Sequence, residues 1–346
     1  MKVCLYLEAE SAVAKSGFRR AFQSHQQALR TAGVEVSTNP NDRDYELLHL
    51  HAFGPKSLYH LNRAKREGIK VVVHAHSVGA HDFRDSFTLS NWIAPVYERY
   101  LSFVYAQADA IFTPTPFAKK MLIQLGIEKP ISVISNGVDS SQFKFSAEAR
   151  EKYRRANNLS RFTVFGAGLV IPRKGIVDFV EMAKRSPQLD FIWYGHRWPK
   201  AFAYHPKMDR ILEEHPGNVR LPGYVEHPSE AFCAGDVLFF PSHTETQGMV
   251  LLEAAALGRP IVVRDLPEFS DWLTHGVDCL KGKTLDEFGE HLLRLSEDRI
   301  LYERLASAAR EMVRNHFIES VGEQLKALYL SVLQNDSARE TAAIHG

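Results

Sequence analysis

Short apolar runs alternate with amphipathic helical patterns along most of this chain, and this alternation limits the fold more than any other sequence feature. The first unit is a buried strand at Val3–Leu7 followed by a helix that ends at Gly33. The apolar face of that helix carries Phe18, Phe22 and Leu29. Repeated strand-helix units of this kind predict a parallel sheet covered by helices on both faces.

The alternation stops once, near the middle of the chain, and then starts again. Before the break, strand patterns lie at 47–52, 69–74, 109–113 and 131–135. After it, they lie at 161–168, 190–194, 219–221, 236–241 and 260–263. The stretch 146–158 between them is polar and has no strand character, so we expect the inter-domain linker there. The sequence thus predicts an α/β protein of two doubly wound, Rossmann-like domains that face each other across a cleft.

The overall composition excludes several classes of protein. The chain has 346 residues, with 42 Lys and Arg against 41 Asp and Glu, which gives no basic field for nucleic acid. Cys4, Cys233 and Cys279 lie in apolar surroundings without metal-binding spacing, as reduced core cysteines of a cytosolic protein do. No apolar run fits a signal peptide or a transmembrane helix. We therefore expect a cytoplasmic protein, soluble or peripheral on the inner face of the cell membrane.

The most specific motif runs from Pro241 to Pro260 and contains two glutamates, Glu245 and Glu253, on either side of a glycine turn. The turn opens a helix, and the backbone N–H groups of residues 247–250 there can approach an anion. Carboxylates accept hydrogen bonds from sugar and ribose hydroxyls, so the motif suits a nucleotide sugar. The alternative interpretation is a solvated Glu253 and a helix-capping Glu245.

This motif resembles the signature of the retaining glycosyltransferases of family GT4, which have the GT-B fold. Three further segments resemble parts of that family: Asn136-Gly137-Val138-Asp139, Pro172-Arg173-Lys174-Gly175 and the run from Asn218 to Val225. The resemblance implies that the two glutamates mark the donor site. It also implies that the second segment binds the diphosphate and that the third frames the base.

The resemblance also implies roles for individual residues. Arg173 and Lys174 would neutralise the leaving diphosphate without a metal, so no metal and no cofactor besides the UDP-sugar co-substrate is expected. The family commonly has an arginine at the position of Leu169, and Arg173 replaces that charge here. The expected catalytic residues are His76, Glu245, Arg173 and Lys174. The expected donor-binding residues are Gly17, Gly195, Tyr224, Val225, Gln247, Gly248, Met249, Val250 and Glu253.

Histidines and acids elsewhere offer other possible sites. His74 and His76 follow a buried strand, and the resemblance favours His76 beside the donor sugar. His49 and His51 share one face of an earlier strand, but the sequence shows no third ligand, so we interpret them as core or cleft-edge histidines. The acid-x-acid pair Asp42 and Asp44 lies in a polar loop and is not interpreted as a metal site.

The segment 81–95 is long, aromatic and charged, and it resembles the same part of bacterial glycolipid synthases of this family. Asp82 and Arg84 are the expected acceptor-binding residues. Phe83, Phe87 and Trp92 would make apolar contacts near a lipid surface. A basic helix with Lys56, Arg63, Lys65 and Arg66 would face anionic headgroups. The alternative is that the aromatic residues belong to the core and that the basic residues form a solvated helix face.

These observations predict a metal-independent, retaining hexosyltransferase that moves glucose or galactose from a UDP-sugar to a glycolipid such as glucosyl-diacylglycerol. We expect residues 1–147 to bind the acceptor together with the C-terminal segment 327–346, and residues 148–326 to bind the nucleotide sugar. The partners are therefore the donor, a glycolipid or saccharide acceptor and an anionic membrane surface, without nucleic acid. The alternatives are a transferase with a soluble or polysaccharide acceptor, a sugar-nucleotide epimerase, and a non-enzymatic sugar-binding protein.

Overall fold

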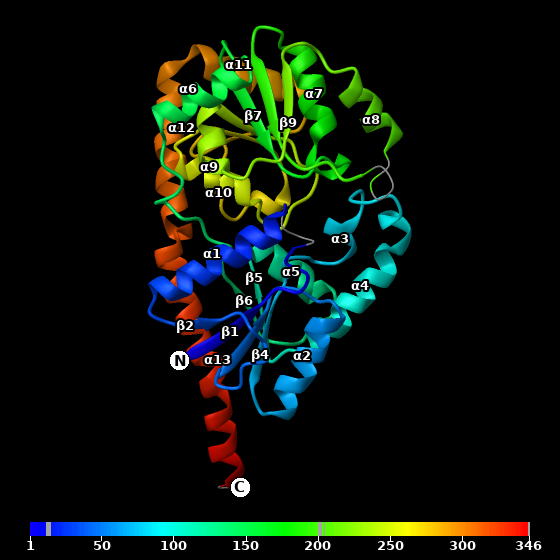
Figure 1. Cartoon of the computed structure of the whole chain (residues 1–346), viewed down its shortest axis with the longest axis vertical. Coiled ribbons are helices and arrows are strands. Elements are labelled where there is room, and N and C mark those ends of the chain that lie inside the picture. The colour runs from blue at the N-terminus through cyan, green and yellow to red at the C-terminus, as the bar shows by residue number, and fades with distance from the viewer. Residues whose placement is uncertain (12–14, 200–202, 204, 345–346) are drawn as a thin grey trace.

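The computed structural model describes residues 1–11, 15–199, 203 and 205–344, with side chains described as far as residue 334. Its strands form two separate six-stranded sheets in which every pairing is parallel. The sheets lie one above the other, each flanked by helices (Figure 1). The α/β architecture that the alternating pattern predicted is confirmed.

The first sheet has the strand order β2-β1-β3-β4-β5-β6. Its strands are β1 (Lys2–Tyr6), β2 (Glu35–Ser37), β3 (Leu47–Leu50), β4 (Lys70–His74), β5 (Ala110–Thr113) and β6 (Ile131–Val133). The helices in this part of the chain are α1 (Gly17–Thr31), α2 (Pro55–Arg66), α3 (Ala80–Phe83), α4 (Ser90–Ala106) and α5 (Pro116–Gln124). Both faces are covered: Leu48 and Leu50 pack in one apolar cluster, and Leu47 packs in another. The alternation of neighbours to opposite faces explains why such strands are apolar throughout.

The second sheet has the order β12-β11-β10-β7-β8-β9. Its strands are β7 (Thr163–Ala167), β8 (Asp190–Tyr194), β9 (Val219–Gly223), β10 (Val237–Phe240), β11 (Ile261–Arg264) and β12 (Leu280–Gly282). Its helices are α6 (Ala147–Ala156), α7 (Ile176–Arg185), α8 (Pro206–Glu213), α9 (Pro228–Ala231), α10 (Met249–Ala256), α11 (Leu285–Glu297) and α12 (Arg299–Met312). Short 3-10 turns η1 (Pro172–Lys174), η2 (Phe232–Ala234), η3 (Pro267–Phe269) and η4 (Val313–His316) complete it.

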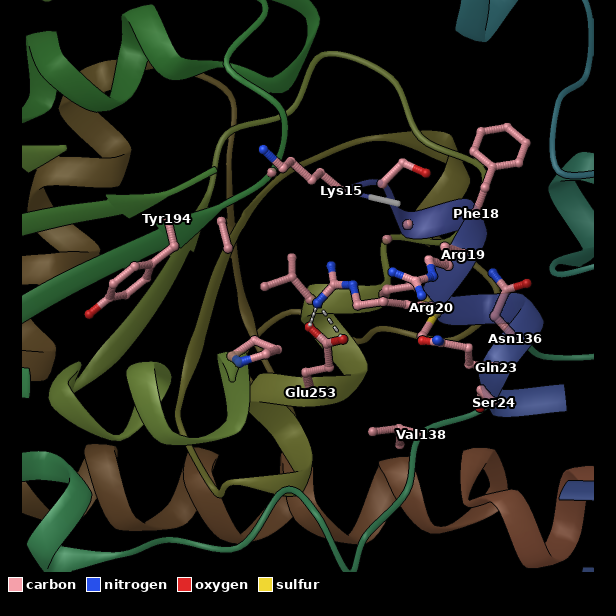
Figure 2. A pocket seen from close by; sticks show the side chains of 18 of the residues that line it. Lys15, Phe18, Arg19, Arg20, Gln23, Ser24, Asn136, Val138, Tyr194 and Glu253 are labelled. Carbon is pink, nitrogen blue, oxygen red and sulfur yellow. Dashed lines mark hydrogen bonds and ion pairs between the residues drawn. The ribbon is translucent and has the colours of Figure 1, made fainter. Parts of the chain in front are cut away.

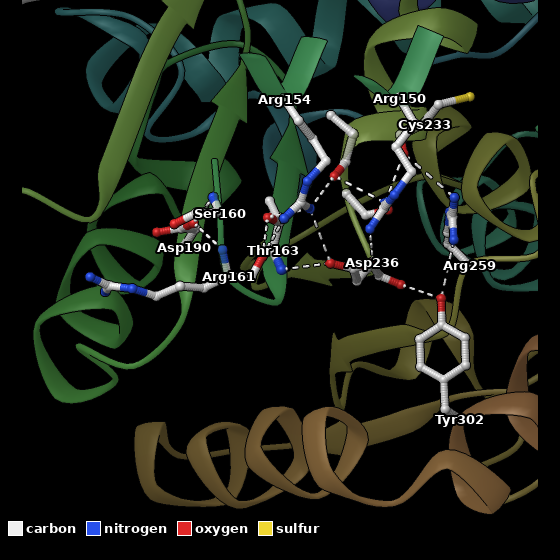
Figure 3. A network of polar contacts seen from close by, with 12 residues as sticks. Arg150, Arg154, Ser160, Arg161, Thr163, Asp190, Cys233, Asp236, Arg259 and Tyr302 are labelled. Atoms are coloured by element: carbon white, nitrogen blue, oxygen red, sulfur yellow. Dashed lines mark hydrogen bonds and ion pairs between the residues drawn. The ribbon is translucent and has the colours of Figure 1, made fainter. Parts of the chain in front are cut away.

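The stretch 146–158 is not the linker that we expected, because it folds as α6 and belongs to the second sheet's layer. The Ser146 side chain accepts a hydrogen bond at the start of this helix. Asp236, which immediately precedes β10, accepts hydrogen bonds from Arg150 at 2.7 Å and from Arg154 at 3.4 Å (Figure 3). It also accepts one from the backbone N–H of Thr163 at 2.8 Å. Two arginines of this polar helix therefore bind the carboxylate of Asp236. The chain crosses from the first sheet to the second over 134–146, before α6 begins.

The last helix, α13 (Ile318–Ile344), returns to the first domain and packs along α1 (Figure 1). Val321, Leu325 and Tyr329 are fully buried in the first sheet's apolar cluster. A Cβ atom at Gly322 would lie 2.1 Å from the backbone oxygen of Ala28, so this helix crossing needs a glycine. The domain limits given above stay a prediction, and residues 345–346 of the C-terminal segment lie outside the described residues. Within the described part of the chain, no helix is long and apolar enough to cross a bilayer.

Candidate functional site

A cleft with a volume of about 750 Å³ separates the two sheets at the carboxyl ends of their strands. Residues from both domains line it, among them the start of α1, the loop after β4 and the loop after β10. This is the edge where doubly wound sheets bind ligands, because the loops and helix starts converge there. The positions of the predicted site residues can therefore be compared within one cavity.

Glu245, in the loop after β10, forms an ion pair across the floor of the cleft. Its Oε1 lies 2.5 Å from Nζ of Lys174, and the two side chains are only 5% and 17% exposed. Burial lowers the pKa of Lys174, and the carboxylate of Glu245 opposes that shift. The structure therefore brings together two of the four predicted catalytic residues, with the cation held beside a carboxylate.

Glu253, in the second turn of α10, pairs with a residue of the opposite domain. Both of its carboxylate oxygens accept hydrogen bonds from one nitrogen of Arg20, at 2.6 and 2.7 Å (Figure 2). The glutamate side chain is 2% exposed and the arginine 33%. Burial raises the pKa of Glu253, and the charge of Arg20 opposes the rise. This ion pair connects α1 to α10 across the mouth of the donor-side pocket.

The predicted anion-binding turn lies at the start of α10. Gly248 has a φ of +83°, a left-handed conformation that favours glycine, and it precedes the first helical residue. Gly248, Met249 and Val250 line the cleft. Gln247 is buried, and its side chain faces the first domain. Its Oε1 accepts a hydrogen bond from the backbone N–H of Asn136 at 3.0 Å, and its Nε2 donates one to Ser135 Oγ at 2.9 Å. Its side chain thus holds the two domains together, and its backbone stays at the turn.

The other predicted donor-side residues line the cleft from both domains. Gly17 is the first residue of α1 and lines the cleft. A Cβ atom at Gly195 would lie 1.7 Å from the carbonyl oxygen of Gly168, so β7 and β8 approach too closely there for any side chain. Tyr224 is 44% exposed and Val225 follows it in the lining. Tyr224 therefore presents part of its ring to the cleft, and Nζ of Lys15 lies over that ring, 5.6 Å from its centroid.

Arg173 links the diphosphate segment to the predicted acceptor segment. Its Nε donates to Ser86 Oγ at 3.1 Å, and its guanidinium donates to the carbonyl of Thr244 at 3.2 Å. Asp82 lines the cleft and accepts hydrogen bonds from Ser77 Oγ and from the N–H of Val78. Burial raises the pKa of Asp82, while the charge of Arg173 opposes the rise.

Three other residues considered in the sequence, Arg84, Asp42 and Asp44, do not line this cavity. Arg84 is exposed and is not among the residues that line the cleft, so the structure separates it from Asp82. Asp42 accepts hydrogen bonds from Ser37 and Asn39, and Asp44 forms an ion pair with Lys2, at the far end of the first sheet. These contacts explain both acids as parts of a polar loop.

His76 lines the cleft, and behind it the structure gathers more histidines than the sequence predicted. Its Nε2 lies 3.0 Å from Nδ1 of His51, and the ring packs edge-on to Phe18. Burial lowers the pKa of His76 to about 3, so the imidazole is neutral at physiological pH. His49 and His51 do gain further histidine neighbours, namely His25 from α1 and His74 from β4. The sequence could not place them together because α1 and β4 are distant in the chain.

Comparisons with known protein families match both domains of the chain. Residues 15–142 match the family model described as Glycosyltransferase Family 4, and residues 161–298 match the one described as Glycosyl transferases group 1. The chain is 35% identical over 342 residues to the processive diacylglycerol alpha-glucosyltransferase of Acholeplasma laidlawii, over 96% of this chain and 99% of that protein. The chain belongs to glycosyltransferase family 4. The family that the motifs resembled is thus confirmed, and the chain is a glycosyltransferase.

Other family 4 relatives and solved structures are more distant. The alpha-galactosylglucosyldiacylglycerol synthase of Streptococcus pneumoniae is 26% identical over 90% of this chain and 86% of its own. The crystal structure of Anabaena HepE in complex with UDP and glucose superimposes with a TM-score of 0.77 at 17% identity, over 96% of this chain and 100% of that one. The structure of sucrose-phosphate synthase from Thermosynechococcus elongatus superimposes with a TM-score of 0.80 at 17% identity, over 97% of this chain and 100% of that one. These likenesses confirm the GT-B fold.

Arg20 is the cleft residue that the sequence analysis missed. It lies in the first turn of α1, which contains no acidic residue and begins Gly17-Phe18-Arg19-Arg20. Cations are unfavourable at the positive end of a helix dipole. Two arginines in this turn thus indicate an acidic partner outside the helix. The partner, Glu253, is 233 residues away, and the tertiary structure alone identifies it.

We predict that replacing Arg20 by Met destabilises the protein in a pH-dependent way. Without the cation, burial alone acts on Glu253 and raises its pKa further above the ordinary value of 4.5. A raised folded-state pKa means that the stability is complete below the unfolded value and decreases as the pH rises through the folded value. Urea unfolding should show a loss of about 1–3 kcal/mol at about pH 8 and a smaller loss at about pH 5.

The double variant Arg20→Met/Glu253→Gln is the matched control for this experiment. It removes the carboxylate whose protonation is invoked, so it should lack the extra loss of stability between about pH 5 and about pH 8 that the single variant shows. An equal pH dependence in the single and the double variant would contradict the assignment of the effect to Glu253.

Proposed function

We propose that this family 4 enzyme transfers a hexose from a UDP-sugar to a glycolipid of the glycosyl-diacylglycerol class, with retention of the anomeric configuration and without a metal. The observation that carries the proposal is the 35% identity, over almost the whole length of both chains, to a processive diacylglycerol alpha-glucosyltransferase. The second diacylglycerol-glycolipid synthase at 26% identity supports the same acceptor class. Anabaena HepE, which has the same fold, was solved with UDP and glucose, and this supports a UDP-hexose as donor.

In this proposal the second domain binds the nucleotide sugar through the residues described above. Glu253 accepts hydrogen bonds from the ribose hydroxyls, and the exposed ring of Tyr224 lies beside the base. The diphosphate lies at the start of α10, where the N–H groups of Gly248 to Val250 and the helix dipole attract an anion. Arg173 and Lys174 supply the positive charge from the other side. Glu245, paired with Lys174, then accepts hydrogen bonds from the hydroxyls of the hexose.

The proposed reaction replaces one C–O bond at the anomeric carbon by another on the same face of the sugar. The acceptor hydroxyl forms the new bond as the bond to the diphosphate breaks, and its proton passes to the departing diphosphate oxygen. Charge builds up on that oxygen, and Arg173, Lys174 and the helix start stabilise it. His76 is neutral, and Phe18 and His51 hold its ring in place beside the sugar. Asp82 is the proposed acceptor-hydroxyl ligand.

We expect product when the enzyme is given UDP-glucose or UDP-galactose with glucosyl-diacylglycerol or diacylglycerol in detergent micelles. Mass spectrometry should show the addition of a hexose, and NMR should show an α-linkage in the product of an α-configured donor. Transfer to water-soluble or polysaccharide acceptors alone would reject the glycolipid acceptor. A β-linkage would reject retention. A changed sugar nucleotide without any acceptor would indicate an epimerase.

The two glutamates should have separable kinetic effects. Glu253→Ala should weaken UDP binding by about 1–3 kcal/mol, because charge-assisted bonds to the ribose are lost. Glu245→Ala should mainly lower kcat, because its contacts are made with the reacting sugar. Calorimetric UDP titration and steady-state kinetics measure the two effects. Glu230→Ala is the control, since this glutamate pairs with Lys152 at the surface. Unchanged UDP affinity in the first variant with normal turnover in the second would reject the donor assignment.

Activity should persist in excess EDTA, because Arg173 and Lys174 are proposed to take the role of a divalent ion at the diphosphate. The measurement is the initial rate of transfer with and without EDTA in the assay. Abolished activity that is rescued by Mg²⁺ or Mn²⁺ would reject the metal-free site. Lys174→Met leaves Glu245 without its cation. This variant should lower the rate of transfer strongly both with and without EDTA.

The outer face of α4 is the proposed lipid-facing surface. Leu89, Trp92, Ile93 and Val96, spaced at helical intervals, are between 48% and 86% exposed. A helix with an apolar outer face fits an interfacial position better than bulk water. Of the predicted aromatic residues, Trp92 fits this surface best, because Phe83 stacks on Tyr97 at 4.0 Å between ring centroids.

The predicted basic helix, α2, differs from the expectation at two positions. Nζ of Lys65 donates to the carbonyl oxygen of Gln107 at 2.9 Å. Arg63 donates to Asn41 at 3.1 Å and to the Tyr45 hydroxyl at 3.0 Å, so its charge holds a loop of the first domain. Lys56 and Arg66 are exposed and remain as candidates for headgroup contacts.

We predict that Trp92→Ser/Val96→Ser and Lys56→Glu/Arg66→Glu each weaken binding to phosphatidylglycerol-containing vesicles. Each basic residue near an anionic surface contributes about 1 kcal/mol, so the charge reversal should lower vesicle binding at least about tenfold at low salt. Ile300→Ser is the matched control, since Ile300 is 82% exposed on the second domain. Vesicle sedimentation measures the effect. Equal binding of the parent to neutral and anionic vesicles, unaffected by either variant, would reject this surface.

A further inference from the structure

Five histidines form one buried cluster on a single face of the first sheet, beneath α1. His49 and His51 come from the end of β3, His74 and His76 from the end of β4, and His25 from α1. Neighbouring rings lie close together: the centroids of His49 and His51 are 4.4 Å apart, and those of His25 and His74 are 4.8 Å apart. All five are at most 7% exposed. Neither the nucleotide-sugar site nor the apolar core requires so many imidazoles in one place.

Three of these residues present nitrogen atoms to a common point. His25, His51 and His74 each have a ring nitrogen within 4.8 Å of the other two. Nδ1 of His25, Nε2 of His51 and both ring nitrogens of His74 are buried and have no hydrogen-bond partner among the described residues. Buried polar atoms are almost always paired, since leaving one unpaired costs free energy. A set of converging, unpaired imidazole nitrogens is what a metal ion requires.

The hydrogen bonds on the other side of the rings fit the same interpretation. Nε2 of His25 lies 2.9 Å from the carbonyl oxygen of Ser135. A carbonyl only accepts, so Nε2 carries the hydrogen and Nδ1 keeps its lone pair. Nδ1 of His51 lies 3.0 Å from Nε2 of His76, and donation by His51 leaves its Nε2 lone pair free as well. Metal-bound histidines usually donate their second N–H in this way, which fixes the ring orientation.

We propose that His25, His51 and His74 form a binding site for a late first-row divalent ion such as Zn²⁺. Three neutral imidazoles are the donors that Zn²⁺, Co²⁺ and Ni²⁺ prefer, and they do not suit Mg²⁺ or Ca²⁺. Zn–N bonds of about 2.0–2.1 Å at tetrahedral angles place ligand nitrogens roughly 3.4 Å apart, so ion binding draws the three rings together. The site lies on the sheet side of His76 and takes no part in the charge neutralisation proposed for Arg173 and Lys174.

The ion has a structural task in this position. It connects α1 to the ends of β3 and β4, and α1 carries Gly17 and Arg20 at the cleft. Through the bond from His51 to His76, it also fixes the ring that faces the donor sugar. The metal therefore braces the wall of the cleft and positions His76 without contacting the substrate. Because its three ligands are fully buried, the ion should stay bound when EDTA is present only during the transfer assay.

The test measures metal content rather than sugar transfer, so its failure is distinguishable from a failure of the proposed function. Untagged full-length protein, expressed with added Zn²⁺ and passed through gel filtration, should retain stoichiometric zinc by mass spectrometry of the elements. Protein loaded with Co²⁺ instead should show the visible d–d bands of a tetrahedral site with nitrogen ligands. Zn²⁺ should also raise the melting temperature of the metal-depleted protein.

His74→Gln is the most informative variant, because it removes an imidazole from the three-histidine site while glutamine keeps a polar side chain next to Asn136, so the variant should fold. Its retained zinc should decrease at least about tenfold, and His51→Gln should behave in the same way. His60→Gln is the matched control, since His60 is buried on α2 beside Tyr6 and outside the cluster. Folded parent protein without bound Zn²⁺ or Co²⁺, or equal zinc in His74→Gln and His60→Gln, would overturn the proposal.

Discussion

The cleft depends on the pairing of two buried carboxylates with two cations. Glu245 and Glu253 are nearly inaccessible to solvent, and a buried charge without a partner is strongly unfavourable. Lys174 supplies the partner within the second domain, and Arg20 supplies it from the first. The second pair makes the closed arrangement of the domains electrostatically favourable. The charges of both buried carboxylates are thus neutralised within the cleft itself.

Further contacts between the domains surround this pair and orient the cleft. Gln247 binds the loop after β6, the Thr115 hydroxyl donates to the carbonyl of Thr246 at 2.8 Å, and Arg173 donates to Ser86. His81 contacts Glu268 at 2.9 Å on the other side. The contacts of Ser86 and His81 connect the second domain to the predicted acceptor segment, and the other two connect it to the loop after β6 and the start of α5. Side chains that a sequence motif assigns to ligand binding therefore also set the distance between the two domains.

The first domain combines two surfaces of different character. Its outer side exposes apolar residues of α4, whereas its inner side buries a cluster of histidines beneath α1. The outer surface is the one that we propose for lipid contact. The inner cluster packs against α1, and α1 carries Arg20, which pairs with Glu253 of the opposite domain.

The sequence by itself determined the elements that depend on local pattern. The buried strands β7, β8 and β10, the glycine turn before α10 and the spacing of Glu245 and Glu253 are all visible in short windows, because hydrophobic periodicity and glycine positions are local properties. The polar segment 146–158 misled that analysis, since two of its arginines, Arg150 and Arg154, bind Asp236 rather than only solvent. The tertiary structure alone decided the partners: Arg20 for Glu253, and His25 and His74 for His51. These pairings join residues that the chain separates widely, and only the packing of α1 against the sheet and the opposite domain brings them within bonding distance.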